Sequence, residues 1–184
     1  MWGPLLMQAA ELANIDTSSG VRATARFASS IVLARASFEA FVSEFIERRL
    51  LAKRIKGIHD LRERILAVHA ALGVDAPDES STPWVELGCV VQLRNAVVHY
   101  EAAPRSPADS PARLYGRFQS LGVVAARRKD QSWERALLTS TVASWSCQVV
   151  GQTVIRLESI ATRRHRSLIH VREQVVRAIQ ILEK

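Results

Sequence analysis

An apolar stripe in the first half of the chain constrains its fold more than any other feature. Within residues 21–56, apolar side chains recur every three or four positions: Ile31, Ala34, Phe38, Phe41, Val42 and Phe45. This spacing places them on one face of a helix, because an α-helix turns once in about 3.6 residues. A helix with one apolar face is stable in water when that face packs against other elements. The stripe therefore predicts a fold made of packed helices.

The same helical spacing recurs along the rest of the chain, whose 184 residues are the length of one ordinary domain. It predicts further helices over residues 60–72, 83–101, 111–121, 132–162 and 167–184. Neither a β-hairpin signal nor an internal repeat interrupts the pattern. We therefore predict a single all-α domain over residues 1–184, an antiparallel bundle of about five or six helices. In this interpretation residues 1–20 are an N-terminal extension and residues 102–113 are a Pro-rich loop.

Charge and composition narrow the possible functions. The chain has 25 Lys and Arg against 18 Asp and Glu, a net charge of +7, which favours acidic partners such as nucleic acid. A basic surface without such a partner explains the charge equally well. Cys89 and Cys147 lie in apolar stretches, as reduced core cysteines of a cytoplasmic protein do. Because metal-ligand spacing, cofactor motifs, a signal peptide and long apolar runs are all missing, we expect no metal, no cofactor and no membrane.

Three polar side chains interrupt the apolar run of residues 87–100. They are Arg94, Asn95 and His99. On a helix, Arg94 would point from the middle of the apolar stripe, while Asn95 and His99 would share its flank at i and i+4. An arginine in that position needs a carboxylate, a subunit interface or an anionic ligand.

Glu39 is the best candidate carboxylate for Arg94, because it stands alone among the apolar residues 36–42 of the first long helix. Glu44 and Glu86 are weaker candidates. A buried Arg94–Glu39 pair, with His99 bonded to a loop carbonyl, would explain the motif structurally, and spacing alone favours this interpretation. The protein would then be a non-catalytic helical interaction or RNA-binding module.

The same three side chains suit metal-independent cleavage of RNA. His99 could take the proton from a ribose 2′-hydroxyl or give one to the leaving 5′-oxygen, because the pKa of histidine is ordinarily close to neutral. Arg94 could stabilise charge on the phosphoryl oxygens, and Asn95 could orient the imidazole or the phosphate. One chain supplies one such histidine, so a two-fold dimer with facing motifs would supply a pair.

Residues 93–100, Leu-Arg-Asn-Ala-Val-Val-His-Tyr, resemble the Arg-x4-6-His signature of the HEPN superfamily, including the polar residue after the arginine. Residues 31–42 are similar to the N-terminal helix of prokaryotic HEPN families, which often carries a Glu such as Glu39. The resemblance implies a dimeric helical bundle and a metal-independent endoribonuclease with Arg94, Asn95 and His99 as catalytic residues. It also implies a toxin–antitoxin, defence or RNA-processing role, with an antitoxin or regulatory protein as a possible partner.

One branch of that superfamily has a tyrosine two residues after the histidine, where a nucleotidyltransferase partner modifies it. Here Glu101 holds that position and Tyr100 directly follows His99, so Tyr100 is assigned only a supporting role and modification by such a partner is not expected.

Two further features bear on RNA binding. Arg163, Arg164 and Arg166 join the last two predicted helices, where they would either contact RNA phosphates or solvate a turn. Trp84, near the start of the motif helix, would either anchor the core or, if exposed, stack on a base.

Overall fold

The structure, a computed structural model, describes residues 1–14, 21–48, 55, 57–98, 111–126, 132–162 and 169–183. These ranges contain eight α-helices and no strand, which confirms the predicted all-α bundle and exceeds the predicted number of helices. The helices are α1 (Trp2–Asn14), α2 (Val21–Arg48), α3 (Leu61–Leu72), α4 (Trp84–Val98), α5 (Pro111–Ser120), α6 (Trp133–Leu137), α7 (Ser140–Thr162) and α8 (Ile169–Leu182).

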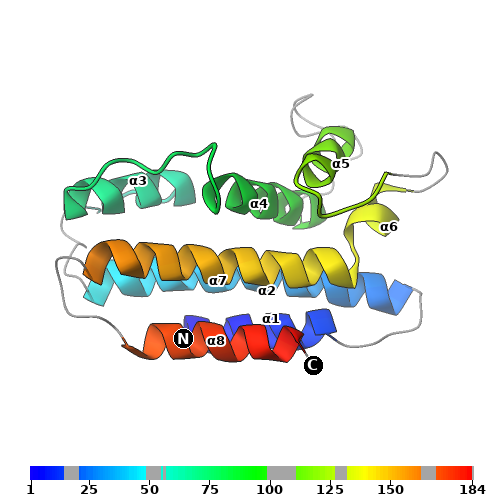
Figure 1. Ribbon diagram of the computed structural model, residues 1–184, viewed down its shortest axis with the longest axis horizontal. Helices are drawn as coiled ribbons and strands as arrows, with labels where there is room; N and C mark the ends of the chain where they lie inside the picture. The colour runs from blue at the N-terminus through cyan, green and yellow to red at the C-terminus, as the bar shows by residue number, and fades with distance from the viewer. Residues whose placement is uncertain are drawn as a thin grey trace.

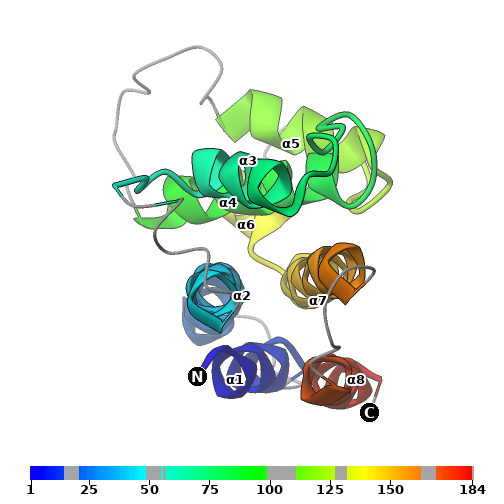
Figure 2. The ribbon, with the colours of Figure 1, turned by 90° about the vertical axis from the view of Figure 1, so that its left-hand side faces the viewer.

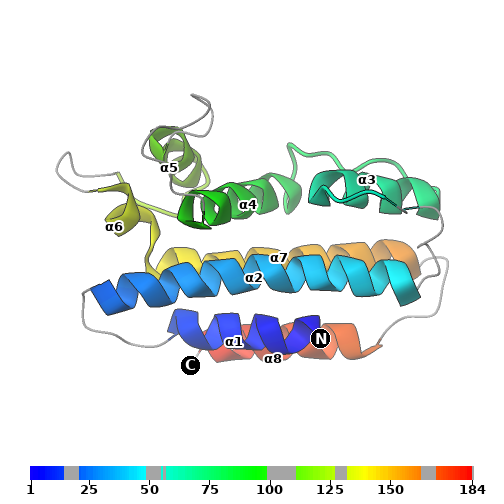
Figure 3. The same ribbon diagram turned by 180° about the vertical axis from the view of Figure 1, so that it is seen from behind.

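The helices are stacked in three layers (Figure 1). The long helices α2 and α7 lie side by side in the middle, with α1 and α8 below them and α3, α4, α5 and α6 above, as the end-on view also shows (Figure 2). We call α1, α2, α7 and α8 the core helices, and α3 to α6 the upper layer. In the view from behind, α3 and α4 follow each other along the top of α2 (Figure 3).

Chain direction differs between the pairs of core helices. The colours of Figure 1 show that α1 and α2 run in opposite directions, as do α7 and α8, whereas α2 and α7 run in the same direction. Short connections favour antiparallel neighbours, and a parallel pair requires the chain to return over a longer path. The upper layer lies between α2 and α7 in the sequence and is part of that return.

Aromatic side chains of α2 form the centre of the core helices. Trp2 of α1 meets Phe41 edge-on, with ring centroids 5.3 Å apart, and Phe41 also contacts Phe38 and Phe45. All four rings are at most 2% exposed. The apolar stripe predicted for the first long helix is therefore buried, and burial on this scale is the main favourable contribution to folding.

The N-terminal segment is not the extension that the sequence predicted. Trp2 begins helix α1, which buries Leu6, Ala9 and Ala10 against the core helices. Ser30 of α2 donates a hydrogen bond to the carbonyl of Ala9 at 2.7 Å, so the two helices are also joined by a polar contact. The small alanine side chains let the two backbones approach closely. Because alanine is small, these positions did not stand out as an apolar stripe, and the sequence did not predict helix α1.

Two predicted helix boundaries agree with the structure and one does not. Helix α3 is capped by the side chain of Asp60, which accepts from the backbone N–H of Glu63, and it ends at Gly73 with a left-handed φ of 63°. The predicted helix 132–162 is wrong as one element, because Leu138 leaves helical geometry between α6 and α7. The hydroxyl of Thr139 then accepts from the N–H of Val142 at 3.3 Å and caps α7.

Candidate functional site

Helix α4 carries the polar motif and has two different long faces. Leu87, Cys89, Val90 and Leu93 are buried in the apolar clusters of the core, whereas Gly88 and Asn95 are exposed. The prediction that Arg94 projects from the middle of the buried stripe is therefore wrong. Arg94 is half-buried and lies at the edge of that stripe. The centre of the buried face is about 60° away from Arg94 around the helix axis.

Arg94 and Asn95 contact each other directly. The Nη1 atom of Arg94 donates to Oδ1 of Asn95 at 3.2 Å. This bond uses the acceptor of the Asn95 amide and leaves its N–H groups available to donate. The structure thus brings together two of the three predicted catalytic side chains, on the last turn of α4.

Glu39 does not pair with Arg94 as the sequence predicted. It forms an ion pair with Arg35, one turn earlier on α2, at 2.7 Å. Glu44 similarly pairs with Arg48 at 2.7 Å. Residues four apart on a helix are surface neighbours, so each glutamate finds a local arginine before one on another helix.

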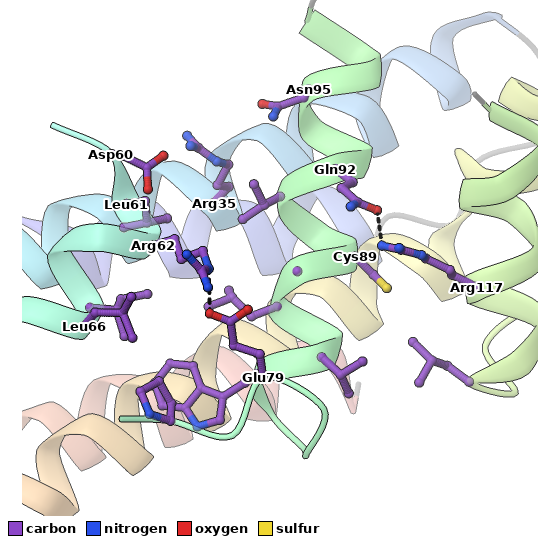
Figure 4. A pocket seen from close by; sticks show the side chains of 18 of the residues that line it. Arg35, Asp60, Leu61, Arg62, Leu66, Glu79, Cys89, Gln92, Asn95 and Arg117 are labelled. Carbon is purple, nitrogen blue, oxygen red and sulfur yellow. Dashed lines mark hydrogen bonds and ion pairs between the residues drawn. The ribbon is translucent and has the colours of Figure 1, made fainter. Parts of the chain in front are cut away.

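A groove runs along the outer face of α4, between α3 and α5 (Figure 4). Its cavity volume is about 640 Å³. We call it the α4 groove; its polar lining residues are Arg35, Asp60, Arg62, Glu79, Gln92, Asn95, Arg117 and Ser120. Asn95 therefore belongs both to the motif and to the groove.

Most of the charges in the groove are already paired. Arg62 donates to Glu79 at 2.5 Å, and Arg35 is held by Glu39. Arg117 of α5 has no carboxylate partner among the residues that the structure describes; its Nη1 donates to Oε1 of Gln92 at 2.8 Å. Figure 4 shows this contact between α5 and α4 and the Arg62–Glu79 pair nearer to α3. The α5 side of the groove therefore has an unneutralised cation, and the α3 side has the carboxylates.

Several hydrogen-bond donors near Asn95 in the groove have no acceptor among the described residues. The Nε atom of Arg35 is buried and has no hydrogen-bond partner within the described part of the chain. The Oε1 atom of Gln92 is used by Arg117, which leaves the amide N–H groups of Gln92 to donate. A region with spare donors and few acceptors favours an anion or a ligand rich in oxygen.

The rest of the groove is apolar. Leu61, Ile65, Leu87 and Val91 contribute side chains, and Trp84 lines one end while half-buried. The Trp84 ring meets His69 edge-on at 5.5 Å between centroids, and Nδ1 of His69 donates to the carbonyl of Ile65 at 2.8 Å. His69 is thus a satisfied core histidine, and Trp84 both anchors α4 and presents part of its ring to the groove.

Two titratable groups of α4 are shifted toward their neutral forms. Burial raises the pKa of the Cys89 thiol, and the nearby Arg117 only partly opposes this. Burial also raises the pKa of the Glu86 carboxyl, whose Oε2 accepts no hydrogen bond from any described residue. A thiol with a raised pKa is a poor nucleophile, so Cys89 is a packing residue of the groove wall.

Several predicted residues lie outside the described residues. These are His99, Tyr100, Arg163, Arg164 and Arg166, together with residues 102–110 of the predicted Pro-rich loop. The last three residues of that predicted loop belong to helix α5 instead. Residues 49–54 of the predicted first long helix and residues 99–101 of the predicted motif helix are likewise outside the description.

Sequence reasoning missed the groove and three of the residues that line it: Arg35, Gln92 and Arg117. The spacing of Gly88, Gln92 and Asn95 at i, i+4 and i+7 was a usable signal, because it places one glycine and two amides on a single outer face of α4. The positions of Arg35 and Arg117 had no such local signal.

Comparison with known proteins adds no family assignment. No protein-family model, curated protein sequence or solved structure matches this chain. Among the described residues, no three His, Cys, Asp or Glu side chains converge as metal ligands would. Over the same ranges, every helix is too short or too polar to cross a membrane.

Proposed function

We propose that this protein is a metal-independent endoribonuclease of HEPN type, acting through Arg94, Asn95 and His99. The observation that carries the proposal is the placement of Arg94 and Asn95. They are hydrogen-bonded on the last described turn of α4, and Asn95 lines a groove with spare hydrogen-bond donors. By sequence spacing, His99 follows Asn95 at i+4, the same side of a continued helix.

In the proposed reaction the ribose 2′-oxygen attacks the adjacent phosphorus while the P–O5′ bond breaks. His99 takes the 2′-hydroxyl proton, and a second histidine gives a proton to the leaving 5′-oxygen. The products are a 2′,3′-cyclic phosphate and a 5′-hydroxyl end. Arg94 stabilises the charge that builds on the non-bridging oxygens. Asn95 holds the Arg94 guanidinium in place through its Oδ1 atom.

A homodimer would supply the second histidine. Val98 ends α4 next to the motif and is 45% exposed among the described residues, so a partner helix could bury it. We propose that two motif helices face each other across a two-fold axis, with RNA held between them. A cytoplasmic setting fits the two free, buried cysteines, and an antitoxin or regulatory protein would restrain the activity.

The test is incubation of the purified protein with mixed RNA in EDTA. Wild type is expected to produce 5′-hydroxyl ends, and His99→Ala is expected to lose at least about a hundredfold in rate, because general acid–base catalysis contributes that much or more. Arg177→Gln, an exposed arginine of α8 on the opposite layer, is the matched control and is expected to cut like wild type.

Circular dichroism must show the same helix content for all three proteins. If His99→Ala cuts RNA as fast as wild type, the role of His99 is wrong. If none of them cuts at concentrations that allow dimerisation but all bind RNA, the protein is the non-catalytic RNA-binding module instead.

A further inference from the structure

We propose that the α4 groove holds one unstacked nucleotide of a single-stranded RNA substrate and thereby restricts cleavage to unpaired RNA. This inference rests on the proposed ribonuclease function and adds a specificity pocket to it. The pocket would receive the nucleotide next to the phosphate that is cleaved.

The groove and the motif are continuous. Asn95 lines the groove and accepts the hydrogen bond from Arg94. Gly88 and Asn95 lie seven residues apart on the same face of α4, which is about 10 Å along a helix. An RNA strand with one phosphate at Arg94 would therefore have its neighbouring nucleotide at the entrance of the groove.

The groove is large enough for one nucleotide. A volume of 640 Å³ lies in the range typical of small-molecule sites, about 300 to 1,000 Å³. Gly88 forms part of the groove floor, and a Cβ atom built on it would meet nothing within 4 Å. The absence of a side chain at this position keeps the groove open at its centre.

Chemical groups follow a fixed order along the groove. Arg117, which has no carboxylate partner among the described residues, offers a positive charge at the α5 side, where a phosphate would bind. Leu61, Val91 and Trp84 offer apolar and aromatic surface to a base, and base–aromatic contacts contribute to single-strand binding. The amides of Gln92 and Asn95 can donate to base or ribose oxygens.

On the other side of the groove the cations are already paired. Arg62 is held by Glu79 and Arg35 by Glu39, and Asp60 adds a carboxylate. This carboxylate would repel a phosphate placed beside it. Arg117 is therefore the favoured phosphate contact, so that the groove suits one nucleotide inserted base-first rather than a continuous strand. A base inside a duplex is stacked and paired, and it cannot enter such a pocket.

The test plugs the groove without disturbing its walls. Gly88→Leu is made in the His99→Ala protein, which is expected to bind RNA without cutting it, and binding of a labelled, unstructured RNA oligonucleotide is measured by fluorescence polarisation. We expect Gly88→Leu to weaken binding about tenfold, since that is the scale of one stacked base. Binding of duplex RNA is expected to stay unchanged. Arg177→Gln in the same background controls for a general effect of surface substitution.

Arg117→Gln is the second variant, and it keeps the test informative if Gly88→Leu fails to fold by circular dichroism. It is expected to weaken single-strand binding severalfold and to reduce its salt dependence, because it removes one phosphate contact. If folded Gly88→Leu and Arg117→Gln both bind the oligonucleotide as tightly as their parent, the groove does not hold a nucleotide. A free mononucleotide could instead bind more tightly than the oligonucleotide, and lose that binding in Gly88→Leu. The groove would then hold a free nucleotide ligand, and the proposal that it holds part of an RNA strand would be wrong.

Cleavage separates this inference from the proposed function. In one outcome, wild type cuts RNA in EDTA while Gly88→Leu cuts single-stranded and duplex RNA at the same rates as wild type. In that case the proposed nucleotide pocket is wrong and the proposed ribonuclease function is retained. If wild type does not cut and Gly88→Leu still weakens single-strand binding, the nuclease is wrong while the nucleotide pocket stands.

Discussion

The core helices and the upper layer are packed differently. Among α1, α2, α7 and α8, large side chains such as Phe38 and Phe41 are almost fully buried and helices approach closely. In the upper layer, α4 buries one face and leaves the other to form an open groove. Both regions bury apolar side chains, but the polar groups able to bind a ligand gather mainly around the upper layer.

Two glycines show the difference most directly. A Cβ atom at Gly151 of α7 would lie 2.9 Å from Cγ1 of Val175 in α8, closer than real side chains pack. A Cβ atom at Gly88 of α4 would meet nothing within 4 Å. The same residue type therefore allows close packing in the core helices and keeps a cavity open in the upper layer.

The largest expected effect is the loss of a core ring. Phe41→Ala should lower the free energy of unfolding by about 3 to 5 kcal/mol, because it removes buried apolar surface and leaves a cavity among packed rings. Urea denaturation measures it, with Leu66→Ala in the half-buried groove wall as the control and a smaller loss expected there. Equal losses in the two variants would mean that stability is shared evenly between the regions.

A smaller effect, with opposite signs, is expected at the two glycines. Gly88→Ala should stabilise the protein by up to about 1 kcal/mol, since alanine has the higher helix propensity and nothing obstructs its methyl group. Gly151→Ala should destabilise it, because the strain of overpacking, about 1 to 3 kcal/mol, outweighs that gain. Thermal melting of both variants measures the difference. Stabilisation by both substitutions would show that α7 and α8 have room to move apart.

The smallest effect concerns the carboxyl of Glu86 in the upper layer. Burial raises its pKa above the ordinary value of 4.5, so the folded state binds this proton more tightly than the unfolded state. The stability of the protein therefore decreases as the pH rises through the interval from 4.5 to the raised pKa, and the penalty is complete above it.

Glu86→Gln removes that penalty. The variant should be slightly more stable than wild type at neutral pH, and the difference should vanish as the pH falls below 4.5. Denaturation midpoints across this range measure it, with exposed Glu173→Gln of α8 as the control. A difference that is the same at every pH would show that hydrogen bonding rather than ionisation of Glu86 sets the effect.

Much of the helical structure could be predicted from local patterns. Asp60 and Gly73 mark the ends of α3 because capping depends on residues within one turn. The stripe of α2 predicted its buried face for a similar reason. The prediction failed for α1, where half of the buried residues are alanines, and between α6 and α7, where the apolar pattern continues across a break at Leu138.

The candidate site was predictable only in part. Arg94 and Asn95 were found because polar groups in an apolar run stand out in any sequence. Their surroundings were not, since Glu39 has an equally plausible partner in Arg35 and the sequence does not rank the two. The exposure of Asn95 and the half-burial of Arg94 follow from where α4 meets α2 and α7, which no local pattern contains.

The sequence by itself determined that this chain forms helices, which faces most of them bury, and that Arg94 and Asn95 stand together at the end of one helix. These properties depend on residues within a few positions of one another, where helical geometry permits few alternatives. Only the tertiary structure decided that Glu39 pairs with Arg35 and that Arg117 reaches Gln92 across the α4 groove. Contacts between distant segments depend on how the helices pack as a whole, and many packings are compatible with the same apolar stripes.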